Sequence, residues 1–151
     1  MCSLLLFSLA ALPIANQNII DVFHKEMPPS LQTLEVTNTV LSEFADEYEY
    51  KIVYHLITDT ASSELIQQYN LPGTHFPFAI AVNGKYSATI NGQTIYFVHF
   101  PLFMHGIGRH EGNWSMDHLE QVLTDRSLLI DENTLPVLVE SEETTECQGE
   151  E

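Results

Sequence analysis

Two β-rich runs separated by a long helical pattern constrain the fold of this chain most strongly. The runs are 18–24 (NIIDVFH) and 51–58 (KIVYHLIT). From about residue 30 onward, apolar residues between them recur at helical spacing. The residues of that face are Leu31, Leu34, Leu41, Phe44 and Tyr48. This order predicts a right-handed β-α-β unit with parallel strands. The second run consists almost entirely of β-formers, which predicts a strand buried on both faces.

Capping residues mark the ends of the predicted helices. Ser30 follows a pair of prolines and is the expected N-cap of the first helix. Asp59 or Thr60 is expected to cap a second helix over about 61–69. Ser115 is expected to cap a last helix over 116–125. The sequence therefore predicts three helices.

Two Asn-Gly pairs, at 83–84 and 91–92, divide the segment before the last helix. Such pairs favour type I′ turns between antiparallel strands. We expect a three-stranded antiparallel meander, with strands over 76–82, 85–90 and 93–100. Together with the β-α-β unit, this predicts an α/β fold with a central mixed sheet, an added antiparallel strand and helices on both faces.

The two ends of the chain differ from its middle. Residues 1–16 form an apolar leader of signal-peptide length, although no basic residue precedes its apolar core. This leader predicts export to the periplasm or the extracellular space, with the cytoplasm as the alternative. We assign 17–130 to one folded domain and 131–151 to a disordered acidic tail. No stable membrane span is expected in the mature chain.

The charge of the chain limits its partners. It has 21 acidic and 5 basic residues and a formal net charge of −16. Such a surface repels phosphate backbones, so we expect no nucleic-acid partner. A protein or peptide partner is compatible with this charge, which also serves solubility. The sequence does not determine the oligomeric state.

The only cysteines, Cys2 and Cys147, lie at the extreme ends of the chain. No CxxC pair is present, so cysteine provides neither a redox pair nor a zinc site within the predicted fold.

The element order resembles that of the thioredoxin superfamily, a three-layer α/β fold. In that family, a strand leads through a proline-containing loop into a long helix, where NIIDVFHK leads into Pro28 and Pro29 here. A cis-proline precedes the third strand of the family, and Pro77 has the matching place before the hairpin AIAVNGK. The family's CxxC positions fall on Pro28-Pro29-Ser30-Leu31, and none of these is cysteine.

The resemblance therefore implies a redox-inactive member of that fold. Disulfide exchange needs a thiolate nucleophile, which a serine hydroxyl cannot replace. We expect no thiol–disulfide oxidoreductase activity and favour a non-catalytic binding or structural module. The resemblance also implies that Phe76 offers its backbone to an extended peptide beside Pro77, with Pro28 and Pro29 lining the site. The alternative is that Pro77 only maintains the fold.

The loop over 99–113 is rich in histidine and glycine and leads to two further hypotheses. His99, His105 and His110, with Glu111, could bind zinc or copper if the loop folds back, although their spacing matches no known zinc motif. Arg109 lies between glycines and is a candidate ligand-binding residue, with an ion pair as its alternative role. An enzyme of unrecognised chemistry using this loop is the third reading. The default expectation is that no cofactor is bound.

Overall fold

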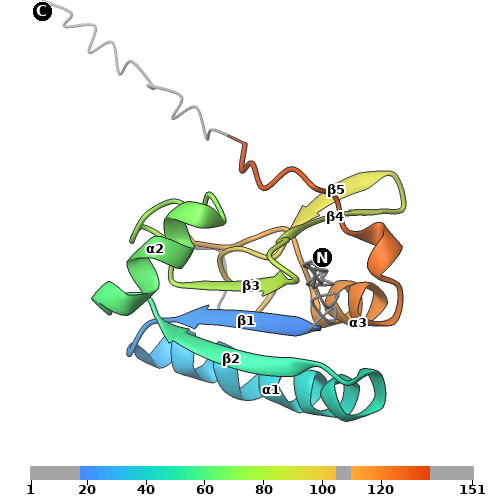
Figure 1. Ribbon diagram of the computed structural model, residues 1–151, viewed down its shortest axis with the longest axis horizontal. Helices are drawn as coiled ribbons and strands as arrows, with labels where there is room; N and C mark the ends of the chain where they lie inside the picture. The colour runs from blue at the N-terminus through green and yellow to red at the C-terminus, as the bar shows by residue number, and fades with distance from the viewer. Residues whose placement is uncertain (1–17, 105–109, 137–151) are drawn as a thin grey trace, which may run out of the picture.

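A mixed three-stranded sheet in the order β2-β1-β3 lies at the centre of the molecule (Figure 1). The computed structural model describes residues 18–104 and 110–136. β1 (Ile19–His24) pairs in parallel with β2 (Lys51–Leu56) and antiparallel with β3 (Phe78–Val82). The predicted parallel β-α-β unit and the mixed character of the sheet are confirmed.

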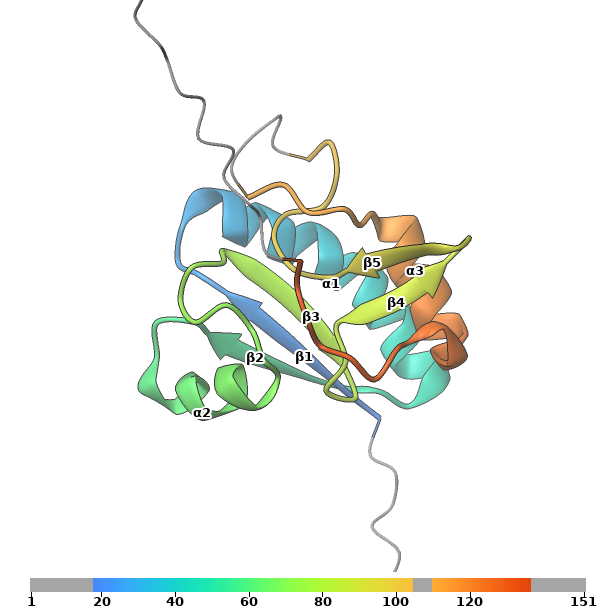
Figure 2. The same ribbon diagram turned by 90° about the horizontal axis from the view of Figure 1, so that it is seen from above.

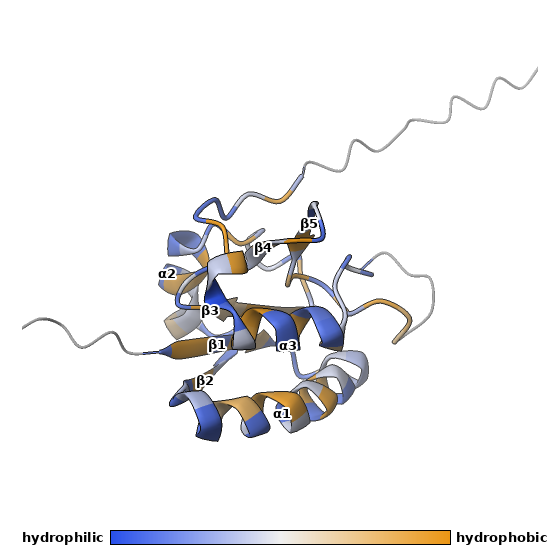
Figure 3. Ribbon diagram, turned by 90° about the vertical axis from the view of Figure 1, so that its right-hand side faces the viewer, coloured by the Kyte–Doolittle hydropathy of each residue, from blue (hydrophilic) through white to orange (hydrophobic). Residues whose placement is uncertain are grey.

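Helices cover both faces of this sheet, as predicted. Alternate residues of β1 point to opposite faces. Ile20 and Val22 belong to a core cluster shared with α1 (Pro28–Tyr48) and α3 (Met116–Thr124). Phe23 belongs to a second cluster shared with α2 (Thr60–Gln68). The hydropathy colouring of Figure 3 shows apolar positions of α1 on its side toward the sheet.

Local capping chemistry explains where the helices begin. The Asp59 carboxylate accepts a hydrogen bond from the Ala61 N–H, and the Ser115 hydroxyl accepts one from the His118 N–H. Both predicted caps are confirmed. The N-cap of α1 is Met27, not Ser30. Proline is suited to the first turn because those N–H groups have no partner within the helix, so the helix begins at Pro28.

The predicted apolar face of α1 is confirmed except at Leu31, and the helix also buries polar residues. Its fully buried residues are Ser30, Thr33, Thr37 and Leu41. Leu31, predicted to face the core, is 45% exposed. The Thr37 hydroxyl donates to the Thr33 carbonyl at 2.8 Å, which satisfies it within the helix. Leu34, Phe44 and Tyr48 pack against the first core cluster.

The predicted three-stranded meander is wrong. β4 (Ser87–Ile90) and β5 (Gln93–Tyr96) form a separate two-stranded sheet. β3 pairs with β1 instead. Towards β4, Val82 of β3 forms an isolated bridge with Lys85, which precedes β4 in the chain. Figure 2 shows the β4–β5 hairpin on the β3 side of the molecule, away from β2. Both Asn-Gly pairs have positive φ at both residues, as type I′ turns require.

The predicted strand over 93–100 divides its pairing between two neighbours. Its first half is β5. Its second half lies beside β3, where the Ile80 N–H donates to the Phe97 carbonyl at 2.9 Å and the His99 N–H donates to the Phe78 carbonyl at 2.8 Å. The added antiparallel strand is thus replaced by a short extension of the central sheet next to β3.

β2 forms the other edge of the three-stranded sheet, and its residues are only half-buried or exposed. The prediction that 51–58 is buried on both faces is therefore wrong. Tyr54 is 46% exposed, and its hydroxyl donates to Asn38 of α1 at 3.0 Å. A run of β-formers does not distinguish an edge strand from a central one, because it does not reveal the number of neighbouring strands.

The domain extends past the boundary predicted at residue 130. After α3, the short 3₁₀ helix η1 (Arg126–Leu128) leads into a segment that pairs with β4, where the Ile130 N–H donates to the Ser87 carbonyl. Asn133 then bonds to the backbone of Tyr86 and Gly84. Leu135 packs on the second core cluster. Residues 131–136 therefore belong to the folded domain.

Two predictions lie outside the described residues: the leader over 1–16 and the tail beyond residue 136. Within the described ranges, no helix has the length and apolar character needed to cross a membrane.

Candidate functional site: a pocket beside the 97–99 segment

A pocket of about 720 Å³ opens beside the segment that extends the sheet next to β3. Four stretches of the chain contribute to it: the loop before β3, the end of β5 with the 98–99 segment, the stretch 110–113, and the C-terminal segment at 135–136. The lining residues are Pro72, His75, Tyr96, Val98, His99, His110, Glu111, Gly112, Asn113, Leu135 and Pro136. A volume of this size holds a small organic molecule.

Backbone pairing between residues 100 and 110–112 positions one wall of the pocket. The Phe100 N–H donates to the His110 carbonyl at 2.7 Å, and the Gly112 N–H donates to the Phe100 carbonyl at 2.7 Å. A Cβ atom added to Gly112 would lie 2.5 Å from the Val98 carbonyl oxygen. Only glycine allows the two backbones to approach this closely.

Asn113 and Trp114 fix the same stretch to the rest of the domain. The Asn113 side chain accepts from the Tyr96 N–H at 2.9 Å and donates to the Thr94 carbonyl at 2.9 Å. The buried Trp114 indole donates to the His99 carbonyl at 3.2 Å and stacks on Phe78. The wall of the pocket is thus tied to both the hairpin and the sheet.

His99 and His110 meet in this wall. Their ring centroids lie 5.8 Å apart, and the rings are inclined by 29°. His99 has a left-handed backbone (φ 69°), which is uncommon outside glycine. Its Nδ1 is buried and has no hydrogen-bond partner among the described residues. Burial, and then the neighbouring His110, lower the pKa of His99, so His99 is neutral at pH 7.

The metal hypothesis is supported only by this pair. His105, its third predicted ligand, lies outside the described residues, as does Arg109. Within 18–104 and 110–136, no group of three or more His, Cys, Asp or Glu side chains is placed to hold a metal ion. Two imidazoles alone do not make the three- or four-ligand site that zinc requires.

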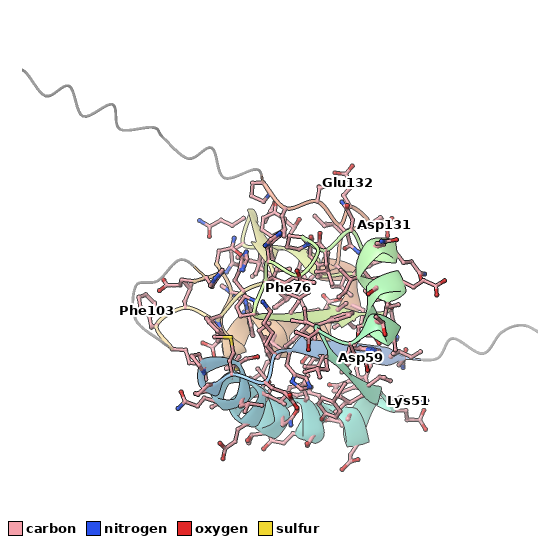
Figure 4. The ribbon with its side chains drawn as sticks, turned by 90° about the vertical axis from the view of Figure 1, so that its left-hand side faces the viewer. Lys51, Asp59, Phe76, Phe103, Asp131 and Glu132 are labelled. Atoms are coloured by element: carbon pink, nitrogen blue, oxygen red, sulfur yellow. The ribbon has the colours of Figure 1, made fainter. Side chains whose placement is uncertain are left out.

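The predicted peptide site at Phe76 and Pro77 is closed. Both residues are buried, and Figure 4 shows Phe76 within the body of the molecule while Phe103 stands at its margin. The described chain contains no cis peptide bond, so the bond before Pro77 is trans and the prediction of a cis-proline is wrong. An X-Pro sequence allows either isomer, and local spacing does not decide between them.

The first turn of α1 lies against Pro77. The Ser30 hydroxyl donates to the Pro77 carbonyl at 2.9 Å and accepts from the Lys25 N–H at 2.9 Å. Pro28 is exposed and Pro29 is half-buried in the same turn. The structure thus places Ser30 against Pro77, but Pro28 and Pro29 are not among the residues that line the pocket.

A second polar cluster, missed by the sequence reasoning, lies between β1, β2 and the end of α2. Asp21 is 4% exposed and accepts hydrogen bonds from His55 and from the Tyr69 hydroxyl. The His55 ring stacks on Phe23 at a centroid distance of 4.9 Å. The sequence signal for this cluster was Asp21 itself, an aspartate within an apolar strand. A buried carboxylate requires hydrogen-bond partners, so its position indicates that polar side chains lie nearby.

No family model, curated protein or solved structure matches this chain. Its fold and site define a mixed α/β domain with a pocket that His99 and His110 help to line.

Proposed function

We propose that this chain is a redox-inactive, thioredoxin-like binding module whose ligand site is the pocket lined by His99 and His110. The observation that carries the thioredoxin-like part is the contact between Ser30 and Pro77. It joins the start of the helix after the first strand to the loop before the third strand, which is where the family places its redox cysteines and its proline.

The absence of redox activity follows from the residues at that junction. No cysteine occurs between residues 18 and 136. The Ser30 hydroxyl donates a hydrogen bond to the Pro77 carbonyl and accepts one from the Lys25 N–H, and both partners are backbone groups. A hydroxyl in this setting has no base to activate it and does not exchange disulfides.

The binding function is assigned to the pocket because the predicted peptide site beside Pro77 is buried. Pro72 and His75 of the loop before β3 line the pocket, so it lies next to the predicted site. Apolar side chains with a few convergent polar groups are the usual lining of a small-molecule site. Val98 and Leu135 supply the first kind, and Tyr96 and Asn113 the second.

Two experiments test this function. In the first, a dithiothreitol-driven insulin reduction assay is run with and without the protein, and we expect equal rates. Acceleration by the protein would overturn the redox-inactive assignment.

In the second, ¹⁵N-labelled protein is titrated with naphthylmethylamine, naphthalenemethanol and naphthoate, three probes with one apolar body. We expect at least one probe to shift the amide signals of Val98, Gly112 and Asn113. His110→Trp enlarges an exposed side chain of the pocket lining and should abolish these shifts, while Gln68→Trp on the exposed face of α2 should preserve them. The absence of pocket shifts with all three probes would refute the binding function.

A further inference from the structure

We propose that the pocket is selective for a small organic cation with an apolar body, such as an alkyl- or arylammonium. This inference rests on the binding function proposed above and adds the chemical class of the ligand. It is carried by the charge of the lining, the aromatic character of one wall and the apolar character of the remainder.

The formal charge of the lining is negative. Among the described lining residues, Glu111 carries the one formal charge at pH 7, and neither Lys nor Arg is present. The chain as a whole, Glu111 included, has a formal net charge of −16. A field of one sign over a partly enclosed site raises the local concentration of the opposite ion, so the pocket attracts cations and disfavours anions.

The histidine wall supports the same sign. His99 is neutral because burial opposes its charged form. A neutral imidazole adds no positive charge to the lining, and each neutral ring has one acceptor nitrogen. An ammonium group offers up to three N–H donors and needs acceptors, whereas a carboxylate offers none.

Tyr96 and the stacked pair of His99 and His110 contribute aromatic side chains to the lining. The face of a tyrosine ring attracts a cation, and the attraction grows as the site excludes water. Val98 is 1% exposed and Leu135 is half-buried, so the remaining wall is apolar. One part of a ligand would thus be held by charge and ring faces, and the other by the hydrophobic effect.

The pocket should lose this selectivity on acidification. The other titratable residues of the lining are His75, Tyr96, His110 and Glu111. When His99 gains a proton, at a pH below its ordinary range because burial lowers its pKa, it adds positive charge beside the ligand. The affinity for a cation should therefore fall with pH, while the affinity for a neutral analogue should change little.

Isothermal titration calorimetry with the naphthyl series tests the proposal, because the probes differ only in charge. We expect naphthylmethylamine to bind about tenfold more tightly than naphthalenemethanol, and naphthoate to bind most weakly. Glu111→Gln should reduce the affinity for the amine to that for the alcohol. Glu120→Gln removes the same charge from the exposed face of α3 and should preserve the preference.

The outcomes separate the two proposals. Equal binding of amine and alcohol, or tightest binding of naphthoate, overturns cation selectivity and leaves the binding function intact. The absence of binding by every probe overturns both. If Glu111→Gln fails to fold, the unaltered protein still decides the matter: because salt screens charge, the amine-to-alcohol affinity ratio must fall between about 0.02 M and about 0.5 M salt, and a constant ratio refutes the proposal.

Discussion

The His55 Nε2 atom lies 2.7 Å from a carboxylate oxygen of Asp21 and ties the edge strand β2 to the central strand β1 through side chains. The other oxygen of Asp21 accepts from the Tyr69 hydroxyl at 2.8 Å. One buried carboxylate thus joins both strands to the end of α2. Removal of this carboxylate would leave His55 and Tyr69, which are partly buried, without their shared hydrogen-bond acceptor.

Asp21→Ala should therefore lower the free energy of unfolding by about 2–4 kcal/mol, because His55 and Tyr69 lose their shared acceptor. Urea denaturation followed by circular dichroism measures this loss. Asp46→Ala, at an exposed position of α1, should change stability by less than about 0.5 kcal/mol. Equal effects of the two substitutions would show that the buried cluster contributes no net stability.

Stability should decline at alkaline pH because of buried tyrosines. Burial raises the pKa of Tyr86 to about 12, and burial with the Asp21 hydrogen bond raises the pKa of Tyr69. In the unfolded chain a tyrosine loses its proton near its ordinary pKa of 10.0. Above that pH the folded state binds more protons than the unfolded state, so stability present below about pH 10 is lost as pH rises further.

Urea midpoints measured at steps between about pH 9 and about pH 12 should show this decline. Tyr86→Phe should reduce the slope of the decline, at the cost of the hydroxyl's hydrogen bonds to the Asn70 and Asn133 carbonyls. An alkaline slope identical to that of the unaltered protein would assign the decline to other groups.

Ser30→Ala should lower the free energy of unfolding by about 1–3 kcal/mol, because the Lys25 N–H and the Pro77 carbonyl both lose their hydrogen bond to the Ser30 hydroxyl. Thermal or urea unfolding measures the change. Ser63→Ala makes the same chemical change on the exposed face of α2 and should be neutral or slightly stabilising. A neutral Ser30→Ala would mean that the turn before α1 and the loop before β3 do not depend on this contact.

Gly112→Ala should destabilise the protein by about 1–3 kcal/mol and displace the wall of the pocket that residues 110–112 form. The added methyl group would meet the Val98 carbonyl at 2.5 Å and the Trp114 ring at 2.9 Å. Gly73→Ala is the matched control, since Gly73 has a φ of 61° but nothing within 4 Å of an added Cβ. It should cost about 1 kcal/mol from backbone strain alone. Unfolding by urea and the naphthyl titration report the two effects separately.

Periodicity predicted much of the fold because the three helices and the parallel unit depend on local spacing and capping residues. It failed where a residue's environment depends on distant segments. Thr33 and Thr37 look polar in the sequence, yet each hydroxyl bonds to a carbonyl one turn earlier and can face the core. The strand over 93–100 looks continuous, yet its two halves pair with different neighbours.

The candidate site was predicted only in part. The sequence marked His99 and His110, and the structure places their rings together through backbone pairing around Phe100. The sequence could not show that Leu135 helps to line the pocket, because its composition placed the end of the domain at residue 130. It also could not show that Phe76 is enclosed, since burial depends on what the rest of the chain packs against it.

The central place of β1 has a consequence for the order in which the sheet can assemble during synthesis. β1 precedes every other described element, yet it pairs with β2 through residues 51–56 and with β3 through residues 78–82. As the ribosome extends the chain, β1 emerges with neither edge covered and gains its parallel neighbour first. Its second edge stays open until β3 follows, and each closure must overcome the entropy of the intervening loop. The interval between these two closures is the period in which the nascent chain exposes an apolar strand to pairing with other chains.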